Sequence, residues 1–94
     1  VIVSGARGKV DFGALAPLFG VRSLRLAKPV EVERHAGARP GSVPLVVPKL
    51  PCVVDEGLFS WERIYGGSGD PGWTLCVHPK VLDAANNVVS HFRV

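Results

Sequence analysis

Apolar residues recur along this chain in short runs, some with the spacing of a strand and some with the spacing of a helix. An apolar run at residues 1–4 predicts a strand. Apolar side chains at helical spacing over residues 12–19 predict a helix, which Asp11 caps and Gly20 ends. Pro17 lies inside this segment, so we expect the helix to be kinked or short.

The middle of the chain predicts a second strand, a second helix and a long loop. Over residues 23–27, Leu24 and Leu26 alternate against Arg25 and the preceding Arg22, which predicts a half-buried strand. Pro29 suits the first turn of a helix that ends before Gly37. Residues 37–51 then contain six Gly and Pro residues, a density that excludes a central strand or a helix. We therefore expect an ordered loop here, and loops of this length in compact domains are commonly functional.

The last part of the chain predicts a buried strand, a hairpin, a helix and a final strand. These segments are residues 52–55, 63–78 with a Gly-rich turn at 66–72, 79–85 and 88–94. Short helices interleaved with short, valine-rich strands are typical of a mixed α/β domain. We predict one domain over residues 1–94, with a curled, barrel-like β-sheet and short helices packed around it. Because the chain opens directly on a strand, we also expect an N-terminal part of the fold to precede Val1.

Composition narrows the class of protein. With 94 residues, 47% hydrophobic and 20% charged, the chain can bury a core, which excludes wholesale disorder. No apolar run approaches the roughly 20 residues that a membrane span requires. Cys52 and Cys76 are too few for a disulfide scaffold and lack metal-ligand spacing, so we expect a reduced pair in a cytoplasmic protein.

The charge is unevenly distributed. Residues 1–47 carry seven basic and three acidic side chains, a net charge of +4, whereas residues 48–94 carry four basic and five acidic ones, a net charge of −1. The basic half can contact a polyanion such as RNA or can simply form a solvated surface. Both interpretations stay open at this point.

Two glycine-containing segments are candidates for chemistry. The turn at residues 66–72 either closes a simple hairpin or presents backbone amides to a ligand; it lacks the Lys-Ser/Thr pair of a phosphate loop. The segment at residues 41–44 is either a surface connection or a rigid loop whose amides face an oxyanion or a water molecule. Asp55 ends a buried strand and either caps the next turn or belongs to a site.

The residues of ordinary catalytic sets are scattered. The three histidines, His35, His78 and His91, are far apart in sequence, so we expect each to be structural or exposed. We expect Cys52 to be an inert core thiol. The two tryptophans, Trp61 and Trp73, are expected to pack, although Trp73 beside the Gly-rich turn can alternatively stack on a base or line a pocket.

Four segments occur in a distinctive order and spacing. They are Val10-Asp11 ahead of the first helix, Leu-Arg-Leu-Ala at residues 24–27, residues 37–44, and Val53-Val54-Asp55 followed by residues 64–72. They lie between residues 10 and 72, and the Gly-Asp-Pro-Gly turn at residues 69–72 is their most specific part. The set resembles the YbaK-type aminoacyl-tRNA editing domain, which occurs inside bacterial prolyl-tRNA synthetases and as free-standing deacylases.

This resemblance implies an activity without metal or cofactor: hydrolysis of the ester that joins a wrong amino acid to a tRNA, here a mis-acylated tRNA-Pro. It implies that backbone amides and the substrate's own ribose hydroxyl position the water. The implied catalytic loop consists of Gly41, Ser42, Val43 and Pro44. The implied substrate-binding residues are Gly67, Ser68, Gly69 and Asp70, of which Asp70 fixes the turn rather than acting as a base.

The implied partners are aminoacyl-tRNA, whose phosphates the arginines of the first half contact, and an aminoacyl-tRNA synthetase; a membrane is not among them. The alternative is a non-catalytic module of the same fold that binds tRNA or a synthetase. The resemblance leaves open which amino acid and tRNA are edited.

The chain departs from the family pattern at four places, one of which is a shorter connection to Val53-Val54-Asp55. The family loop reads Gly-x-x-x-Pro, and from Gly41 this pattern puts Leu45 at the proline position, while Pro44 fits only with a one-residue deletion. A small polar residue before the Gly-rich turn falls on Gly67, with Ser68 one place later. The functional lysine of the family lies on a strand upstream of the matched part, so either a preceding segment supplies it or this chain is inactive alone.

Overall fold

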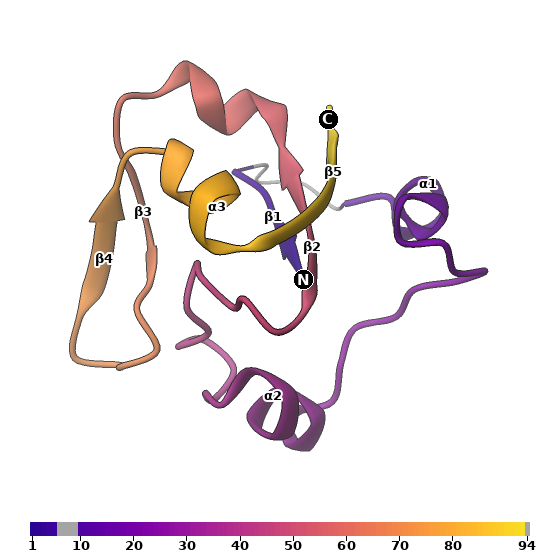
Figure 1. Ribbon diagram of the computed structural model, residues 1–94. Coiled ribbons are helices and arrows are strands. Elements are labelled where there is room, and N and C mark those ends of the chain that lie inside the picture. The colour runs from indigo at the N-terminus through magenta and orange to yellow at the C-terminus, as the bar shows by residue number, and fades with distance from the viewer. Residues whose placement is uncertain (6–9, 94) are drawn as a thin grey trace.

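A three-stranded parallel sheet forms the centre of the protein (Figure 1). The computed structural model describes residues 1–5 and 10–93. The sheet has the order β1-β2-β5, with β1 at Ile2–Val3, β2 at Pro51–Asp55 and β5 at Asn87–Phe92. All three strands were predicted near these positions, although the predicted end of the last one, Val94, lies outside the described residues.

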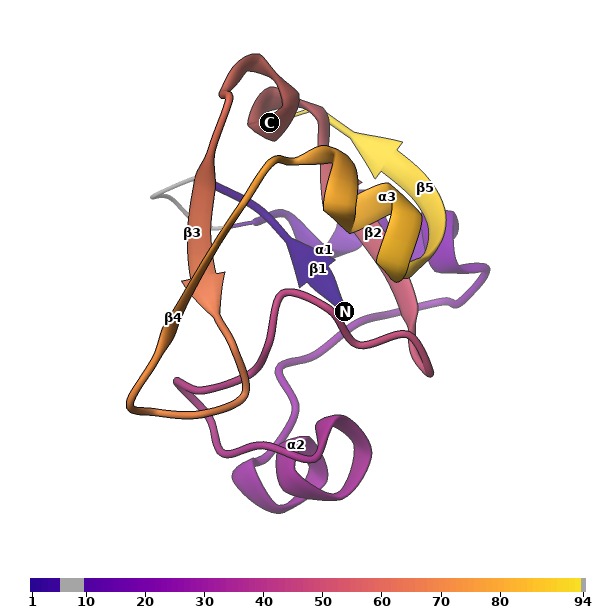
Figure 2. The ribbon, with the colours of Figure 1, turned by 60° about the vertical axis from the view of Figure 1, so that its left-hand side comes forward.

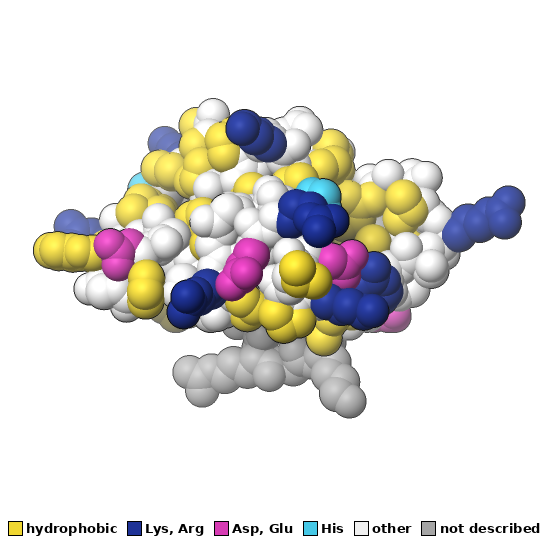
Figure 3. All heavy atoms as spheres, turned by 90° about the horizontal axis from the view of Figure 1, so that it is seen from below, with side chains coloured by type: hydrophobic (Ala, Val, Ile, Leu, Met, Phe, Trp, Pro, Cys, Tyr) yellow, Lys and Arg dark blue, Asp and Glu magenta, His cyan; other side chains and the backbone are white. Residues whose placement is uncertain are grey.

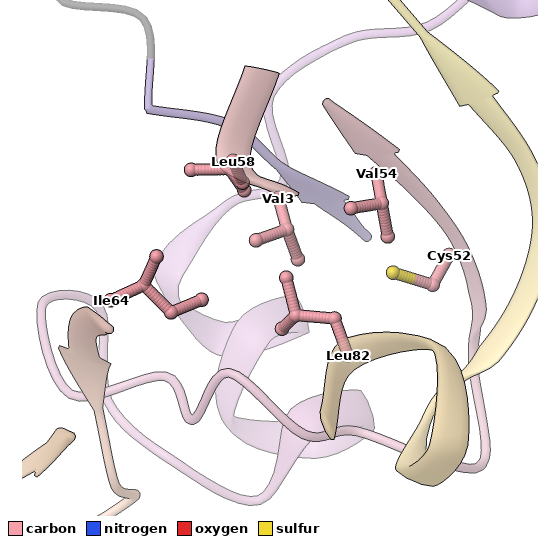
Figure 4. Packing of buried hydrophobic residues seen from close by; sticks show 6 residues of the cluster. All are labelled: Val3, Cys52, Val54, Leu58, Ile64 and Leu82. Carbon is pink, nitrogen blue, oxygen red and sulfur yellow. The ribbon is translucent and has the colours of Figure 1, made fainter. Parts of the chain in front are cut away.

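The middle strand β2 is buried on both faces. Cys52, Val53 and Val54 are each 0% exposed, as expected for a continuous apolar run at the centre of a parallel sheet. On one face, Cys52 and Val54 pack in a cluster with side chains from β1, the hairpin and the last helix (Figure 4); the other members are Val3, Leu58, Ile64 and Leu82.

The other face of the sheet is covered by the first helical segment. It consists of α1 (Phe12–Leu15), whose Asp11 cap accepts a hydrogen bond from the amide of Ala14, and a 3-10 turn η1 (Ala16–Phe19), which lies against β2 and β5. Pro17 falls at the change from α to 3-10 geometry, and Gly20 ends the segment at φ 71°. The predicted short or kinked helix is confirmed.

A 3-10 turn, a hairpin and a helix form the crossover between β2 and β5. A 3-10 turn η2 (Glu56–Ser60) leads into an antiparallel hairpin of β3 (Ile64–Gly67) and β4 (Thr74–Val77), and α3 (Lys80–Ala85) follows. The hairpin stands to one side of the central sheet (Figure 2). The mixed α/β prediction is confirmed, and in the described residues the two sheets remain separate rather than closing into a barrel. Among all the described residues, no helix is long and apolar enough to cross a membrane.

The predicted strand at residues 23–27 is wrong. This segment pairs with neither sheet, and Leu26 is 79% exposed. The side chain of Arg25 reaches forward to the carboxylate of Glu31, with N–O distances of 2.7 and 2.9 Å. Alternation of apolar and polar residues is necessary for a half-buried strand, but without a neighbouring edge the backbone hydrogen bonds have no partners.

The helix that follows, α2 (Pro29–Ala36), is stabilised mainly at its own ends. Pro29 occupies the first turn, Gly37 ends the helix at φ 72°, and the helix buries no residue completely. The carboxylate of Glu31 accepts a hydrogen bond from the backbone amide of Lys28. In Figure 2, α2 lies below the sheet. The helix therefore lies outside the hydrophobic core and contributes no buried residue to it.

The pKa of Glu31 provides a test of this arrangement. The hydrogen bonds from Arg25 and from the amide of Lys28 lower its pKa from 4.5 to about 2. Because the folded-state pKa is depressed, the stabilisation by Glu31 is present above pH 4.5 and is lost as the pH falls toward 2. An NMR titration of the Glu31 carboxylate should therefore have its midpoint near 2. In an Arg25→Gln variant the midpoint should move up toward 4.5, and an unchanged midpoint would contradict the ion pair.

Candidate active site

A long loop leads from the end of α2 to the start of β2, as the sequence predicts for residues 37–51. Near its beginning, the amide of Ser42 donates to the carbonyl of Arg39 at 2.9 Å, which closes a turn. Gly41 within that turn has φ 87°, a left-handed conformation that side chains with a Cβ rarely adopt. We call residues 41–45 the 41–45 loop.

The 41–45 loop rests directly on strand β3. The amide of Leu45 donates to the carbonyl of Gly67 at 2.9 Å. A Cβ added to Gly67 would overlap the carbonyl oxygen of Val43 and lie 2.8 Å from its carbon, and one added to Gly66 would lie 2.6 Å from the side chain of Leu45. The two glycine-containing segments that the sequence singled out, more than 20 residues apart, therefore touch each other.

The Gly-rich turn, residues 66–72, is held by its own polar side chains. The Ser68 hydroxyl donates to the carbonyl of Trp73 at 2.8 Å and accepts from the amide of Asp70 at 3.2 Å. One carboxylate oxygen of Asp70 accepts from the amide of Gly72 at 2.8 Å. Both polar side chains are therefore engaged in the turn, and Asp70 has the turn-fixing geometry expected from the sequence.

A cavity of about 410 Å³ lies where the end of α2, the 41–45 loop and the Gly-rich turn meet. Of the eight residues proposed from the sequence, Ser42 and Gly69 line it. The other lining residues are Glu33, Gly37, Ala38, Arg39 and Pro71. The remaining proposed residues do not line the cavity; they are Gly41, Val43, Pro44, Gly67, Ser68 and Asp70. Within this last group, Gly67 lies against Val43, so it supports the loop from behind.

The 41–45 loop offers backbone donors. Among the described residues, the amides of Gly41 and Val43 have no hydrogen-bond acceptor, whereas the amide of Ser42 is bound to Arg39. Uncommitted N–H groups on a rigid loop beside a cavity suit an oxygen that gains negative charge. Of the four loop residues that the resemblance implies, Gly41 and Val43 therefore have amides available to a substrate oxygen, and both flank Ser42 on the cavity wall.

Charged side chains near the cavity carry both signs. Arg39 and Glu33 on its wall are 3.8 Å apart, and both are exposed. Seen from below, Lys and Arg side chains alternate with Asp and Glu on this face (Figure 3). The basic excess of the first half therefore forms no uniform positive patch on this face.

Several of the titratable residues noted in the sequence stabilise the fold, and His35 is exposed, as expected. His78 accepts from the amide of Lys80, and His91 pairs with Asp83 at 2.9 Å. Asp55 is buried and caps η2, accepting from the amide of Gly57 and the hydroxyl of Ser4. Burial raises the pKa of the Cys52 thiol, which keeps it protonated and unreactive.

The expectation that both tryptophans pack is wrong. Trp61 is 65% exposed and Trp73 is 75% exposed. The hairpin extends beyond the central sheet, so Trp73 at the start of its return has no core to enter. An aromatic residue in a strand pattern commonly packs, but in the part of the chain that the structure describes both rings stay largely exposed.

One contributor to the site was not predicted at all. Asn86, between α3 and β5, is buried, and its side-chain amide bonds the backbone on both sides of Val46. Nothing in the sequence distinguishes it from its exposed neighbour Asn87. An asparagine in a sequence indicates local turns and caps, whereas this contact joins residues about 40 positions apart.

Comparison with known proteins identifies the family and the fold. The family described as aminoacyl-tRNA editing domain matches residues 1–84. No curated protein matches the sequence significantly. Among solved structures, "a putative trans-editing enzyme for prolyl tRNA synthetase" is 28% identical with a TM-score of 0.79, covering 95% of this chain and 57% of its own.

Two further structures are similar. A scaffold protein for computational epitope backbone grafting is 26% identical with a TM-score of 0.81, covering 99% of this chain and 60% of its own. Hypothetical protein APE2540 is 32% identical with a TM-score of 0.74, covering 86% of this chain and 55% of its own. The chain thus spans less than two thirds of the length of each of these structures. The chain belongs to the aminoacyl-tRNA editing domain family.

Proposed function

We propose that this chain carries the aminoacyl pocket of a deacylase that hydrolyses mis-acylated tRNA-Pro, with the scissile ester placed in the cavity beside the junction of the 41–45 loop and the Gly-rich turn. The observation that carries the proposal is the docking of these two segments on each other beside a cavity. Leu45 is bonded to Gly67 at 2.9 Å, and both Ser42 and Gly69 line the cavity. The similarity to the structure described as "a putative trans-editing enzyme for prolyl tRNA synthetase" supports the choice of tRNA.

The proposed reaction is hydrolysis of an ester. A water molecule adds to the carbonyl carbon, and the bond from that carbon to the ribose oxygen then breaks. A proton from the added water goes to the ribose oxygen, and the products are a free amino acid and an uncharged tRNA. The amides of Gly41 and Val43 donate to the carbonyl oxygen while its charge increases, and the neighbouring ribose hydroxyl orients the water.

The cavity wall carries few side chains. Gly37, Ala38 and Gly69 contribute little or no side chain to it, so an aminoacyl group can approach the backbone closely, and its volume of about 410 Å³ has room for that group. Arg39 on the wall is the proposed contact for a tRNA phosphate. The exposed ring of Trp73, which follows the Gly-rich turn, is the proposed stacking surface for a base of the single-stranded 3′ end.

The test is deacylation of alanyl- and cysteinyl-tRNA-Pro, measured both with this 94-residue chain and with the longest natural chain that contains it. We expect release of one amino acid well above the spontaneous rate, at least from the longer chain. The same tRNA carrying proline is the control and should stay charged.

The outcomes separate the two functions considered. Absence of release from both chains, with tRNA still bound, would contradict the deacylase and identify the non-catalytic module. Absence of both release and binding would contradict both functions.

A further inference from the structure

The 41–45 loop is held from two sides. On one side it rests on β3, through the hydrogen bond from Leu45 to Gly67 and the close approach of Val43 to the same glycine. On the other side, the carbonyl of Leu45 accepts a hydrogen bond from the side-chain amide of Asn86 at 2.8 Å. Both backbone groups of Leu45, its N–H and its C=O, are therefore held by hydrogen bonds.

Asn86 makes a second bond to the same segment. Its Oδ1 accepts from the amide of Val47 at 2.7 Å, while its Nδ2 donates to the carbonyl of Leu45. One planar amide thus bridges two backbone groups two residues apart, in the pattern that a neighbouring strand would use. Asn86 is only 9% exposed, so breaking either bond would leave a polar group unsatisfied away from water.

Asn86 is itself rigidly placed. Its backbone amide donates to the carbonyl of Leu82 at 3.1 Å, and the side chain of Leu82 is fully buried in the main cluster. The next residue, Asn87, begins β5 opposite Pro51 of β2. Asn86 therefore connects the core, through its backbone bond to Leu82, with the 41–45 loop, through its side-chain bond to Leu45.

We propose that Asn86 is a positioning residue for the deacylation site, because its side-chain amide sets the register of the 41–45 loop relative to the cavity. This inference rests on the proposed function. Asn86 lies two positions beyond the segment that matches the family. It touches no substrate, so its effect passes through the backbone of Leu45.

Two substitutions separate the two hydrogen bonds. Asn86→Asp keeps an acceptor for the Val47 amide but replaces the donor to the Leu45 carbonyl with a second acceptor. Asn86→Leu removes both bonds and keeps the branched shape of a side chain with the same number of heavy atoms. The control is Asn87→Asp, the same change at the exposed neighbouring residue.

Amide hydrogen exchange followed by NMR gives a readout that needs no substrate. We expect the Val47 amide to exchange at least about tenfold faster in Asn86→Leu but to remain protected in Asn86→Asp. The amides of Val53 and Val54, in the central strand, report whether the fold as a whole has loosened, and we expect them to change little.

Kinetics with mischarged tRNA-Pro then test the link to the site. Both Asn86 variants should show kcat reduced about tenfold with KM nearly unchanged, since the loop is displaced while the tRNA contacts remain. Asn87→Asp should match the unsubstituted protein. Unchanged kcat in both Asn86 variants of an active protein would overturn this inference alone, whereas an inactive unsubstituted protein would overturn the proposed function instead. An equal rise in exchange at Val47 and Val54 would show a general structural role and would also overturn it.

Discussion

Replacing Gly67 with alanine is expected to lower kcat for deacylation about 10²-fold while the central sheet stays folded. The added Cβ would overlap the carbonyl oxygen of Val43 and lie 2.8 Å from its carbon, below the 3.0 Å that real contacts respect. Backbone cannot rotate away as a side chain does, so the 41–45 loop must move by about 1 Å. A displacement of this size at a reacting centre commonly costs two orders of magnitude in rate.

Gly66 provides the matched control. An alanine there would meet the side chain of Leu45 rather than backbone, at 2.6 Å. Gly66→Ala should therefore lose activity and recover much of it in combination with Leu45→Ala, which removes the obstructing atoms. The Gly67→Ala loss should not be recovered by Leu45→Ala. Full activity of Gly67→Ala, measured by release of amino acid from mischarged tRNA-Pro, would show that the docking of the loop on β3 is irrelevant to the reaction.

Replacing Gly41 with valine is expected to abolish deacylation for a different reason, which is conformational. Gly41 has φ 87°, and a left-handed backbone costs a residue with a Cβ about 1–2 kcal/mol, more when the side chain is β-branched. No atom lies within 4 Å of the position that a Cβ would take, so the strain arises from the backbone alone. Relieving it reorients the peptide groups that flank Gly41, and with them the two uncommitted amides of the loop.

Gly20 is the matched control for this backbone strain, because it has a similar φ but lies away from the site. It has φ 71°, an added Cβ would again meet nothing within 4 Å, and it ends η1 on the other side of the sheet. Gly20→Val and Gly41→Val should therefore lower the melting temperature by similar amounts, and only Gly41→Val should lose activity. If Gly41→Val is as active as Gly20→Val, the assignment of the loop to catalysis is wrong.

Local patterns predicted most of the elements, because the signals involved are local. Asp11 and Gly20 mark the ends of the first helical segment through hydrogen bonds and backbone angles within a few residues. The hairpin follows from the Gly-rich turn between two apolar runs, and the buried β2 from three consecutive apolar residues. The strand expected at residues 23–27 failed because a strand requires a partner, and alternation alone does not show whether one is present.

The candidate site was predicted in part. The sequence singled out the 41–44 segment and the Gly-rich turn, and the fold brings them together. It did not indicate that Ser42 and Gly69 would line the cavity while Gly67 supports the loop from behind. Glu33 and Arg39 of the cavity wall were also missed as site residues, since charged residues at a helix end are usually solvated.

The sequence by itself determined the order and type of the local elements, because caps, turns and apolar periodicity act between near neighbours. Only the tertiary structure decided which amides of the 41–45 loop stay uncommitted and that Asn86, rather than Asn87, bonds that loop. The contacts that hold the loop, from Leu45 to Gly67 and from Asn86 to Leu45, join residues about 20 to 40 positions apart. They depend on how the hairpin and α3 pack on the central sheet. No single local pattern encodes that packing, because it is the joint result of all the buried faces of the chain.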